Sequence, residues 1–504
     1  MLVPQLIAVG IAAALLLRIC PRSFRWIILL VANLGFYAMR SLSGLPFLLI
    51  TICSTYAGGQ MIRRFRETAD QAKAGGDREE RRRIKKQTER RCRGVVFAVL
   101  LINFGILAVL KYLDEILGLV GSEPLGLLHP LGISFYTFQS AGYLLDVAGG
   151  KCKAERNILR LALFLSYFPQ LIQGPISRSA QLLPQLAEPE TVSFEGMLKA
   201  FLRILWGLAK KLILADRAMP FVNAVFDGGQ YGGKITVLAV LLYSLQQYCD
   251  FSGGIDMVLG LSELMGVRLS ENFRQPYFAV TLADFWRRWH ISLGNWMRDY
   301  VFYPFALSKP MTALSKKLKK WNVRLSRALP AALGNILVFF LVGLWHGATA
   351  NYILWGLYNG IILALSTLIF RQEGRPTSPF THLLCVLRTF VIVNIGWFFD
   401  RADSARTAFG MIAGIFTTWG NPVHAGLLSE LGLSPADGGV LICGTLLLFV
   451  VSLLLERGVQ VREKLVAFSF PIRWLMFLLL IFSVLIFGIW GSGFNEASFL
   501  YYKF

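Results

Sequence analysis

The chain alternates long apolar stretches with short polar loops over its whole length. A helix needs about 20 apolar residues to cross roughly 30 Å of hydrocarbon, and about a dozen stretches of the 504-residue sequence qualify. They lie near 2–20, 24–40, 43–61, 94–118, 158–176, 195–215, 234–262, 331–348, 350–370, 383–399, 436–455 and 472–490. The pattern predicts an all-α polytopic membrane protein with about 11–12 transmembrane helices.

Two other segments, 129–148 and 284–307, mix apolar residues with Gly, Pro, Arg and His. Polar or irregular backbone persists at membrane depth only where it is buried in protein or lines a wet cavity. These segments therefore predict re-entrant or interfacial helices. The first 20 residues lack a basic start and a small-residue cleavage site, so we expect a retained helix and not a cleaved signal.

Composition and charge indicate that these helices lie in a lipid bilayer and which of their loops face the cytoplasm. Hydrophobic residues make up 55% of the chain, and 51 Lys and Arg against 30 Asp and Glu give a net charge of +21. The basic residues lie in loops, notably 63–93, 315–327 and 456–473, which the positive-inside rule assigns to the cytoplasm. One more span then puts the C-terminus outside. The excess charge indicates contact with anionic lipid headgroups and no nucleic-acid partner.

Cysteine usage offers no framework for a metal or for disulfides. The seven cysteines are scattered without a CxxC pair, whereas zinc sites and disulfide scaffolds have recognisable spacings. We therefore expect no metal site.

Two histidines, His290 and His346, lie in apolar segments rich in tryptophan and glycine. Ionisable side chains are costly inside a membrane and usually mark a reaction or transport path. A buried imidazole can serve as a base near neutral pH, although a lone buried histidine can also be a hydrogen-bonded core residue. The other histidines, His129, His382 and His424, lie at segment edges, where a structural role is the simpler interpretation.

Six motifs in fixed order resemble the membrane-bound O-acyltransferase (MBOAT) superfamily, in particular its bacterial AlgI/DltB-like branch and within it the alginate O-acetylation type. They are PLGISFYTFQSAGYLLDV (130–147), YFPQLIQGPISR (167–178), QQYCDFSGGIDMVLGL (246–261), ENFRQPYF (271–278), DFWRRWHISLGNWMRDYVFYPF (284–305) and LWHGATANYILWGLYNG (344–360). The resemblance runs from about residue 100 onward and implies helices around a central tunnel. It divides the chain into N-terminal helices with a charged loop (1–93), a catalytic core (94–400) and C-terminal helices (401–504).

The resemblance also assigns roles to the histidine motifs. The histidine of WHG, here His346, carries over as the catalytic residue, and that of WRRWH, here His290, as its functional partner. The tryptophans beside them predict packed walls of a substrate site; these are Trp286, Trp289 and Trp345.

Arginines and a polar motif complete the candidate site. Arg287, Arg288 and Arg298 suit the phosphates of a coenzyme A or phosphopantetheine donor, or equally lipid headgroups or Asp284 and Asp299. In DFSGGID, the polar side chains of Asp250, Ser252 and Asp256 predict an internal network that shapes the cavity. The commoner family wording is DFSGYSDM, so Gly254 and Ile255 depart from it and weaken any substrate inference from alginate enzymes.

The last six residues, FLYYKF (499–504), resemble the FxYxxF tail of some bacterial members of the family. In this register Tyr501 matches the tyrosine thought to receive the acyl group, and a phenol ester remains activated toward a sugar hydroxyl. The alternative is an aromatic belt at the membrane interface.

Together these features predict an envelope O-acyltransferase in the bacterial cytoplasmic membrane. A donor, acetyl-CoA or an acyl carrier protein thioester, would pass its acyl group through the tunnel to Tyr501. An extracytoplasmic SGNH-type transferase would then modify a polysaccharide, and no permanently bound cofactor is expected. The alternatives are D-alanyl transfer to teichoic acid and a transporter that makes no bonds.

Overall fold

The computed structural model describes residues 2–75, 77–229, 231–369 and 378–490, which are helical almost throughout. Within those ranges the β-type pairing is a single antiparallel bridge between Phe273 and Trp289. The prediction of an all-α fold is confirmed. The FLYYKF tail, with Tyr501, lies outside the described residues.

Seven helical stretches of the described chain are long and apolar enough to cross a membrane, so this is a multi-pass membrane protein. They are Arg22–Lys73, Arg78–Gly118, Val323–His346, Ala350–Ile369, Pro379–Arg401, Pro435–Glu456 and Phe470–Phe487. The sequence predicted about a dozen spans. The counts differ partly because some apolar stretches form shorter helices, such as Val3–Ile19 and Ile158–Gln173.

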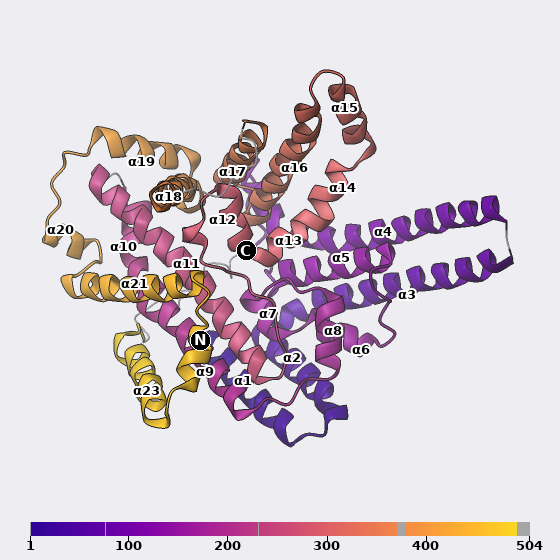
Figure 1. Ribbon diagram of the computed structural model, residues 1–504, viewed down its shortest axis with the longest axis horizontal. Coiled ribbons are helices and arrows are strands. Elements are labelled where there is room, and N and C mark those ends of the chain that lie inside the picture. The colour runs from indigo at the N-terminus through magenta and orange to yellow at the C-terminus, as the bar shows by residue number, and fades with distance from the viewer. Residues whose placement is uncertain (1, 76, 230, 370–377, 491–504) are drawn as a thin grey trace. The chain divides into compact units, whose positions relative to one another are not determined.

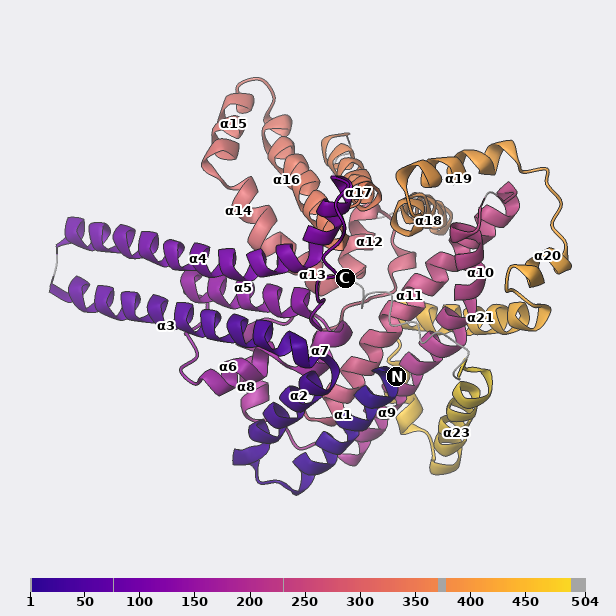
Figure 2. The same ribbon diagram turned by 180° about the vertical axis from the view of Figure 1, so that it is seen from behind.

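The chain forms two compact units, and the first comprises Met1–Met197 and Leu261–Ser270. Its main helices are α1 (Leu2–Ile19), α2 (Arg25–Ser41), α3 (Leu45–Gly75), α4 (Arg78–Leu119), α5 (Ile133–Gly149), α6 (Ile158–Leu165), α7 (Phe168–Gln173) and α8 (Ser179–Ala187). Both views show α3 and α4 side by side as a long pair (Figures 1 and 2).

Buried polar side chains tie α3, α4 and α5 together. The hydroxyl oxygens of Thr55 and Ser140 lie 2.6 Å apart, and Asn103 Nδ2 donates to Ser140 Oγ at 2.9 Å. Each of these groups would be costly in an apolar interior without a partner. The charged segment at 63–93, for which the sequence allows a helix or a loop, belongs to this pair, since α3 and α4 continue as helices beyond their apolar parts.

The second unit comprises Leu198–Gly260 and Glu271–Phe504. Two of its three boundaries with the first unit fall inside α9 (Phe194–Leu208) and α11 (Gly233–Leu264), and the third follows Ser270. Two π-helical segments also belong to it, Ala209–Ala215 and Arg298–Phe302. Its other main helices are α10 (Asp216–Asp227), α12 (Leu282–Arg288), α13 (Ile291–Met297), α14 (Tyr303–Ala306), α15 (Lys309–Lys319), α16 (Val323–His346), α17 (Ala350–Ile369), α18 (Pro379–Arg401), α19 (Ala405–Thr417), α20 (Ala425–Glu430), α21 (Pro435–Glu456), α22 (Val461–Ala467) and α23 (Phe470–Phe487).

Glycines let α16 and α17 approach closely in this unit. A Cβ atom on Gly343 would lie 2.5 Å from the Tyr352 carbonyl oxygen, and one on Gly356 would lie 2.3 Å from that of Phe339. Small residues at membrane helix contacts permit such approach of two backbones. The glycines near His346 therefore serve helix packing, and this packing fixes the end of α16 on which His346 lies.

Candidate active site

A cavity of about 670 Å³ in the second unit contains both candidate histidines in its wall. Its lining comes from α12, α13 and the turn between them, from α14, α16, α17 and the π-helical segment Arg298–Phe302, and from Arg274, which precedes α12. His290 and His346 are separated by 56 positions in the sequence, yet both line this cavity. Its volume falls within the usual range of about 300–1,000 Å³ for small-molecule sites.

His346 is the last residue of α16, where Gly347 continues in an extended conformation. The residue is 5% exposed, and its ring centroid lies 4.9 Å from that of Trp355 and 5.7 Å from that of Tyr352. An imidazole at the end of a long, packed helix is held in place by that helix. The arrangement suits a group that must keep its orientation while a substrate binds.

His290 lies in a sharp turn between α12 and α13 and is 4% exposed. Its backbone is left-handed, with φ of 46° and ψ of 52°, a conformation that costs a non-glycine residue about 1–2 kcal/mol. The Asn272 side chain lies beside its ring, with Nδ2 3.2 Å from His290 Nδ1. Asn272 belongs to the ENFRQPYF motif, but no pattern in the sequence indicates that it contacts His290.

The tryptophans predicted to form walls occupy different positions around the cavity. Trp286 and Trp289 line it, and Trp286 Nε1 donates to Asn359 Oδ1 at 3.2 Å. Trp345 does not line the cavity as predicted, although its ring centroid lies 6.2 Å from that of His290 and 5.1 Å from that of His346. Trp355, which was not predicted as a site residue, also lines the cavity.

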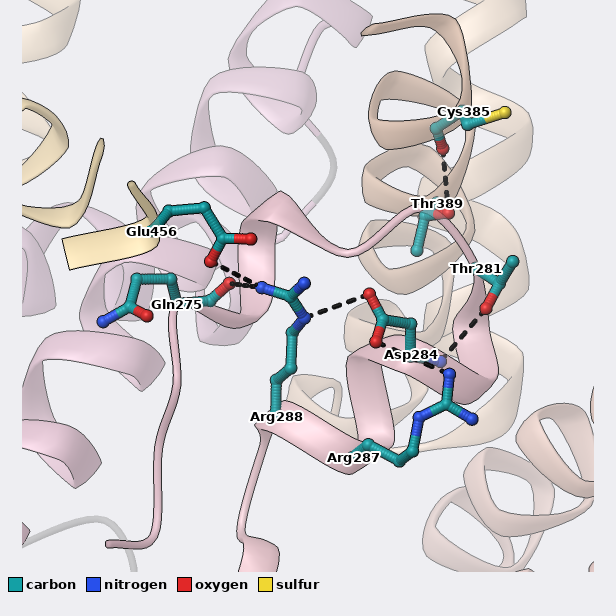
Figure 3. A network of polar contacts seen from close by, with 8 residues as sticks. All are labelled: Gln275, Thr281, Asp284, Arg287, Arg288, Cys385, Thr389 and Glu456. Carbon is teal, nitrogen blue, oxygen red and sulfur yellow. Dashed lines mark hydrogen bonds and ion pairs between the residues drawn. The ribbon is translucent and has the colours of Figure 1, made fainter. Parts of the chain in front are cut away.

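Arg287, Arg288 and Arg298 all line the cavity, but their side chains have different partners. Arg288 Nε bonds to Asp284 Oδ2 at 3.0 Å, and its Nη1 bonds to Glu456 Oε2 at 2.7 Å (Figure 3). Burial disfavours the charge of Arg288, but the bond to Glu456 and the attraction of Asp284 outweigh it and raise its pKa. Arg288 therefore links α12 to the end of α21.

Arg287 and Arg298 are the more accessible of the three. The Arg287 side chain is 70% exposed and lies 3.5 Å from Asp284, while that of Arg298 is half-exposed beside Asp299. Arg274, which was not predicted as a site residue, is also exposed and lines the cavity. These three guanidinium groups are the better candidates for an anionic ligand.

The polar residues of DFSGGID do not line this cavity. They form an internal network, in which Lys210 Nζ bonds to Ser252 Oγ at 2.8 Å and to Asp256 Oδ2 at 2.7 Å, but none of them lines the cavity that the network was predicted to shape. Asp250 pairs with Lys211. The paired lysines within an otherwise apolar stretch were the available sequence signal for these partners.

No group of three or more His, Cys, Asp or Glu side chains that could hold a metal ion occurs among the described residues. The chemistry that this site can supply from its own residues is proton transfer, hydrogen bonding and anion binding.

Residues 151–392 match the family model of the membrane-bound O-acyltransferases. This chain carries an MBOAT domain. The cavity residues from Arg274 to Thr367, both histidines included, lie within the matched range, whereas Glu456 and Tyr501 lie beyond it.

Several curated proteins are similar to this chain over part of its length. A probable alginate O-acetylase AlgI of Pseudomonas aeruginosa is 34% identical over 352 residues, which are 69% of this chain and 61% of that protein. A peptidoglycan O-acetyltransferase of Helicobacter pylori is 31% identical over 349 residues, 63% of each protein. A teichoic acid D-alanyltransferase of Bacillus subtilis is 28% identical over 285 residues, 55% of this chain and 69% of that protein. The chain thus spans about three fifths of the length of the first two of these relatives.

Proposed function

We propose that this chain is an O-acyltransferase that moves an acyl group from a thioester donor across the bacterial cytoplasmic membrane. The acyl group that we propose is acetyl. The observation that carries the proposal is the joint lining of one cavity by His290, His346 and accessible arginines inside the MBOAT domain. Acyl transfer needs a base, a donor for the developing oxyanion and exclusion of water. One buried histidine can serve as the base and the other as the hydrogen-bond donor, and the tryptophans around them help to exclude water.

In this mechanism His346 is the general base. It takes the proton from an acceptor hydroxyl as the oxygen attacks the thioester carbonyl carbon and a new C–O bond forms. The C–S bond then breaks, and the leaving thiolate recovers the proton. His290 assists at the same carbonyl. Arg287, Arg298 and Arg274 bind the phosphates of the donor, either acetyl-CoA or the phosphopantetheine arm of an acyl carrier protein.

Tyr501 supplies this acceptor hydroxyl, so its phenol oxygen takes the acyl group as the thiolate leaves. On the extracytoplasmic side the phenol ester passes the acyl group to a hydroxyl of a partner transferase of the SGNH type, which releases the phenol of Tyr501 and modifies a polysaccharide. The relatives named for alginate and peptidoglycan O-acetylation support an O-acetyl group and a polymer acceptor. The relative named for teichoic acid supports D-alanyl transfer as the second candidate. The basic loops support a cytoplasmic donor side by the positive-inside rule.

The test uses the full chain in membrane vesicles with labelled acetyl-CoA, labelled acetyl carrier protein or labelled D-alanyl carrier protein. We expect one donor to leave covalent label on the chain or on the acceptor polymer. His346→Ala should abolish labelling, and His382→Ala, at an exposed histidine outside the cavity, should not. Label that crosses the vesicle membrane without covalent attachment would establish a transporter instead.

The relay has a test of its own. Mass spectrometry of the C-terminal peptide should find the acyl group on Tyr501, and Tyr501→Phe should remove it while the neighbouring Tyr502→Phe should not. An unmodified Tyr501 in protein that transfers label to polymer would eliminate the relay and leave the rest of the mechanism standing.

A further inference from the structure

Asn272 forms the other side of the turn that holds His290. Its side-chain Oδ1 accepts a hydrogen bond from the backbone N–H of Ser292 at 2.9 Å, and its carbonyl oxygen accepts one from the N–H of Ile291 at 3.0 Å. One residue further out, Phe273 and Trp289 form the isolated antiparallel bridge. The segment that begins at Asn272 therefore clamps the backbone on either side of His290.

This clamp explains the unusual backbone of His290. A left-handed non-glycine residue persists only where its surroundings stabilise it. Ile291 and Ser292 begin α13, and the first N–H groups of a helix have no partner within that helix. Asn272 supplies acceptors for two of them, so the same residue secures the turn and the start of α13.

The orientation of the Asn272 amide follows from these bonds. Only the oxygen of an amide side chain can accept a hydrogen bond, so the atom that faces the Ser292 N–H is Oδ1. The amide nitrogen then lies 3.2 Å from His290 Nδ1. Asn272 is 0% exposed, so its N–H groups cannot donate hydrogen bonds to solvent water.

Two placements of the imidazole proton have to be weighed. Oδ1 lies 3.3 Å from Nδ1 and could accept a proton carried there. In that case the buried Nδ2 would face an N–H instead of an acceptor, and an unsatisfied buried donor costs about 1–3 kcal/mol. With Nδ1 unprotonated, Nδ2 donates to it and Oδ1 keeps the Ser292 N–H. The second placement satisfies both ends of the amide.

We propose that Asn272 is a positioning residue that holds His290 in the tautomer protonated at Nε2, so that His290 acts in acyl transfer as a neutral hydrogen-bond donor and not as a base. The inference rests on the proposed function. It separates the two histidines: His346 takes the acceptor's proton and returns it to the leaving thiolate, whereas His290 keeps its own proton. The Nε2–H group stabilises the negative charge that develops on the thioester oxygen.

The charge state of His290 agrees with this role. His290 lies outside the seven candidate spans, and its burial lowers its pKa to about 3. The ring is therefore neutral near pH 7, where a neutral imidazole has one donor and one acceptor nitrogen. The acceptor nitrogen is Nδ1, which receives the hydrogen bond from Asn272 Nδ2.

The first experiment reads the tautomer without reference to activity. The full chain is prepared with 15N-labelled histidine rings in lipid, and the His290 signals are assigned by their loss in His290→Gln. We expect a protonated Nε2 and an unprotonated Nδ1. A protonated Nδ1 in the unaltered chain would overturn the proposal.

The second experiment measures turnover. Asn272→Asp retains an acceptor for Ser292 but replaces the N–H donor by a second acceptor, so the proton should move to Nδ1. We expect kcat to fall by about 10²–10³-fold, the usual effect of removing one oxyanion donor, with the donor KM unchanged. Asn322→Asp is the matched control, because Asn322 caps α16 by accepting from the Leu325 N–H and Asp also serves as an N-cap. An unchanged kcat in Asn272→Asp would contradict the proposal.

A third variant covers the case in which Asn272→Asp fails to fold. The amide of His290→Gln can replace a donor but cannot act as a base, so its kcat should exceed that of His290→Ala by at least about tenfold, a difference of about 1.4 kcal/mol. Equal kcat values would refute the donor role. A protonated Nε2 in a chain that transfers no acyl group would refute the proposed function and leave the assignment of Asn272 intact.

Discussion

The two histidine segments reach one cavity by opposite structural means. His346 ends the 24-residue α16, whose position is set by close packing against α17. His290 lies between two seven-residue helices, in a strained turn fixed by hydrogen bonds to Asn272. A long helix can hold a group that must exchange protons, whereas a hydrogen-bonded turn can also determine which ring nitrogen carries the proton. The difference suggests that the two imidazoles are not interchangeable.

The largest expected effect comes from replacing the proposed base. His346→Gln keeps a polar side chain of similar length but cannot take up a proton. We expect its transfer rate to fall by about 10²–10⁴-fold, the usual contribution of a general base. Initial rates of label transfer measure this, with an unchanged unfolding temperature in detergent as evidence of folding. Near-normal transfer by His346→Gln would assign the base elsewhere and remove the contrast with His290.

Packing near the two histidines should respond differently to one added methyl group. In Gly343→Ala the new Cβ would lie 2.5 Å from a backbone oxygen of α17, whereas in Gly294→Ala it would lie 3.6 Å from the Trp286 oxygen. We expect Gly343→Ala to lower the free energy of unfolding by about 1–3 kcal/mol through overpacking. Gly294→Ala should raise it by about 0.5–1 kcal/mol, because Gly294 is helical.

Thermal unfolding of the two glycine variants in the same detergent measures these changes. If Gly343→Ala were as stable as the unaltered chain, close approach of α16 and α17 could not be what positions His346.

The arginines beside His290 should separate into a structural and a ligand-binding group. Arg288→Gln removes charged hydrogen bonds to Asp284 and Glu456, and we expect a loss of about 1–3 kcal/mol in the free energy of unfolding. Arg287→Gln alters a side chain that is 70% exposed. It should leave stability unchanged and raise the donor KM by about tenfold, the usual scale for one contact worth 1.4 kcal/mol.

Donor titrations and unfolding curves on both arginine variants are the measurement. An unchanged donor KM in Arg287→Gln would exclude this arginine from the donor site.

The sequence was most informative where function concentrates residues into continuous motifs. His290, His346, Trp286 and the arginines were predicted as one site, and all of them line one cavity. The contact between His290 and Asn272 was not predictable, because neither hydrophobic periodicity nor composition indicates a left-handed histidine or the partner that stabilises it. The span count also differed, since apolar length alone does not show where a helix breaks.

The smallest expected effect concerns the charge state of His290. Burial lowers its pKa to about 3, whereas an unfolded histidine has a pKa of about 6.5. Below about pH 6.5 the unfolded chain therefore binds a proton at this residue, whereas the folded chain does not. The free energy of unfolding decreases as the pH falls below about 6.5, and it goes on decreasing until about pH 3. Between pH 7 and pH 6 this one group should lower the free energy of unfolding by about 0.7 kcal/mol.

His290→Gln lacks this group, so the difference between its unfolding curve and that of the unaltered chain isolates the contribution of His290. Equal pH dependence of the two would mean that His290 titrates alike in the folded and unfolded chains. The two histidines would then not differ in the way that their surroundings imply, because a ring that charges freely near pH 6 is not held as a neutral donor by Asn272.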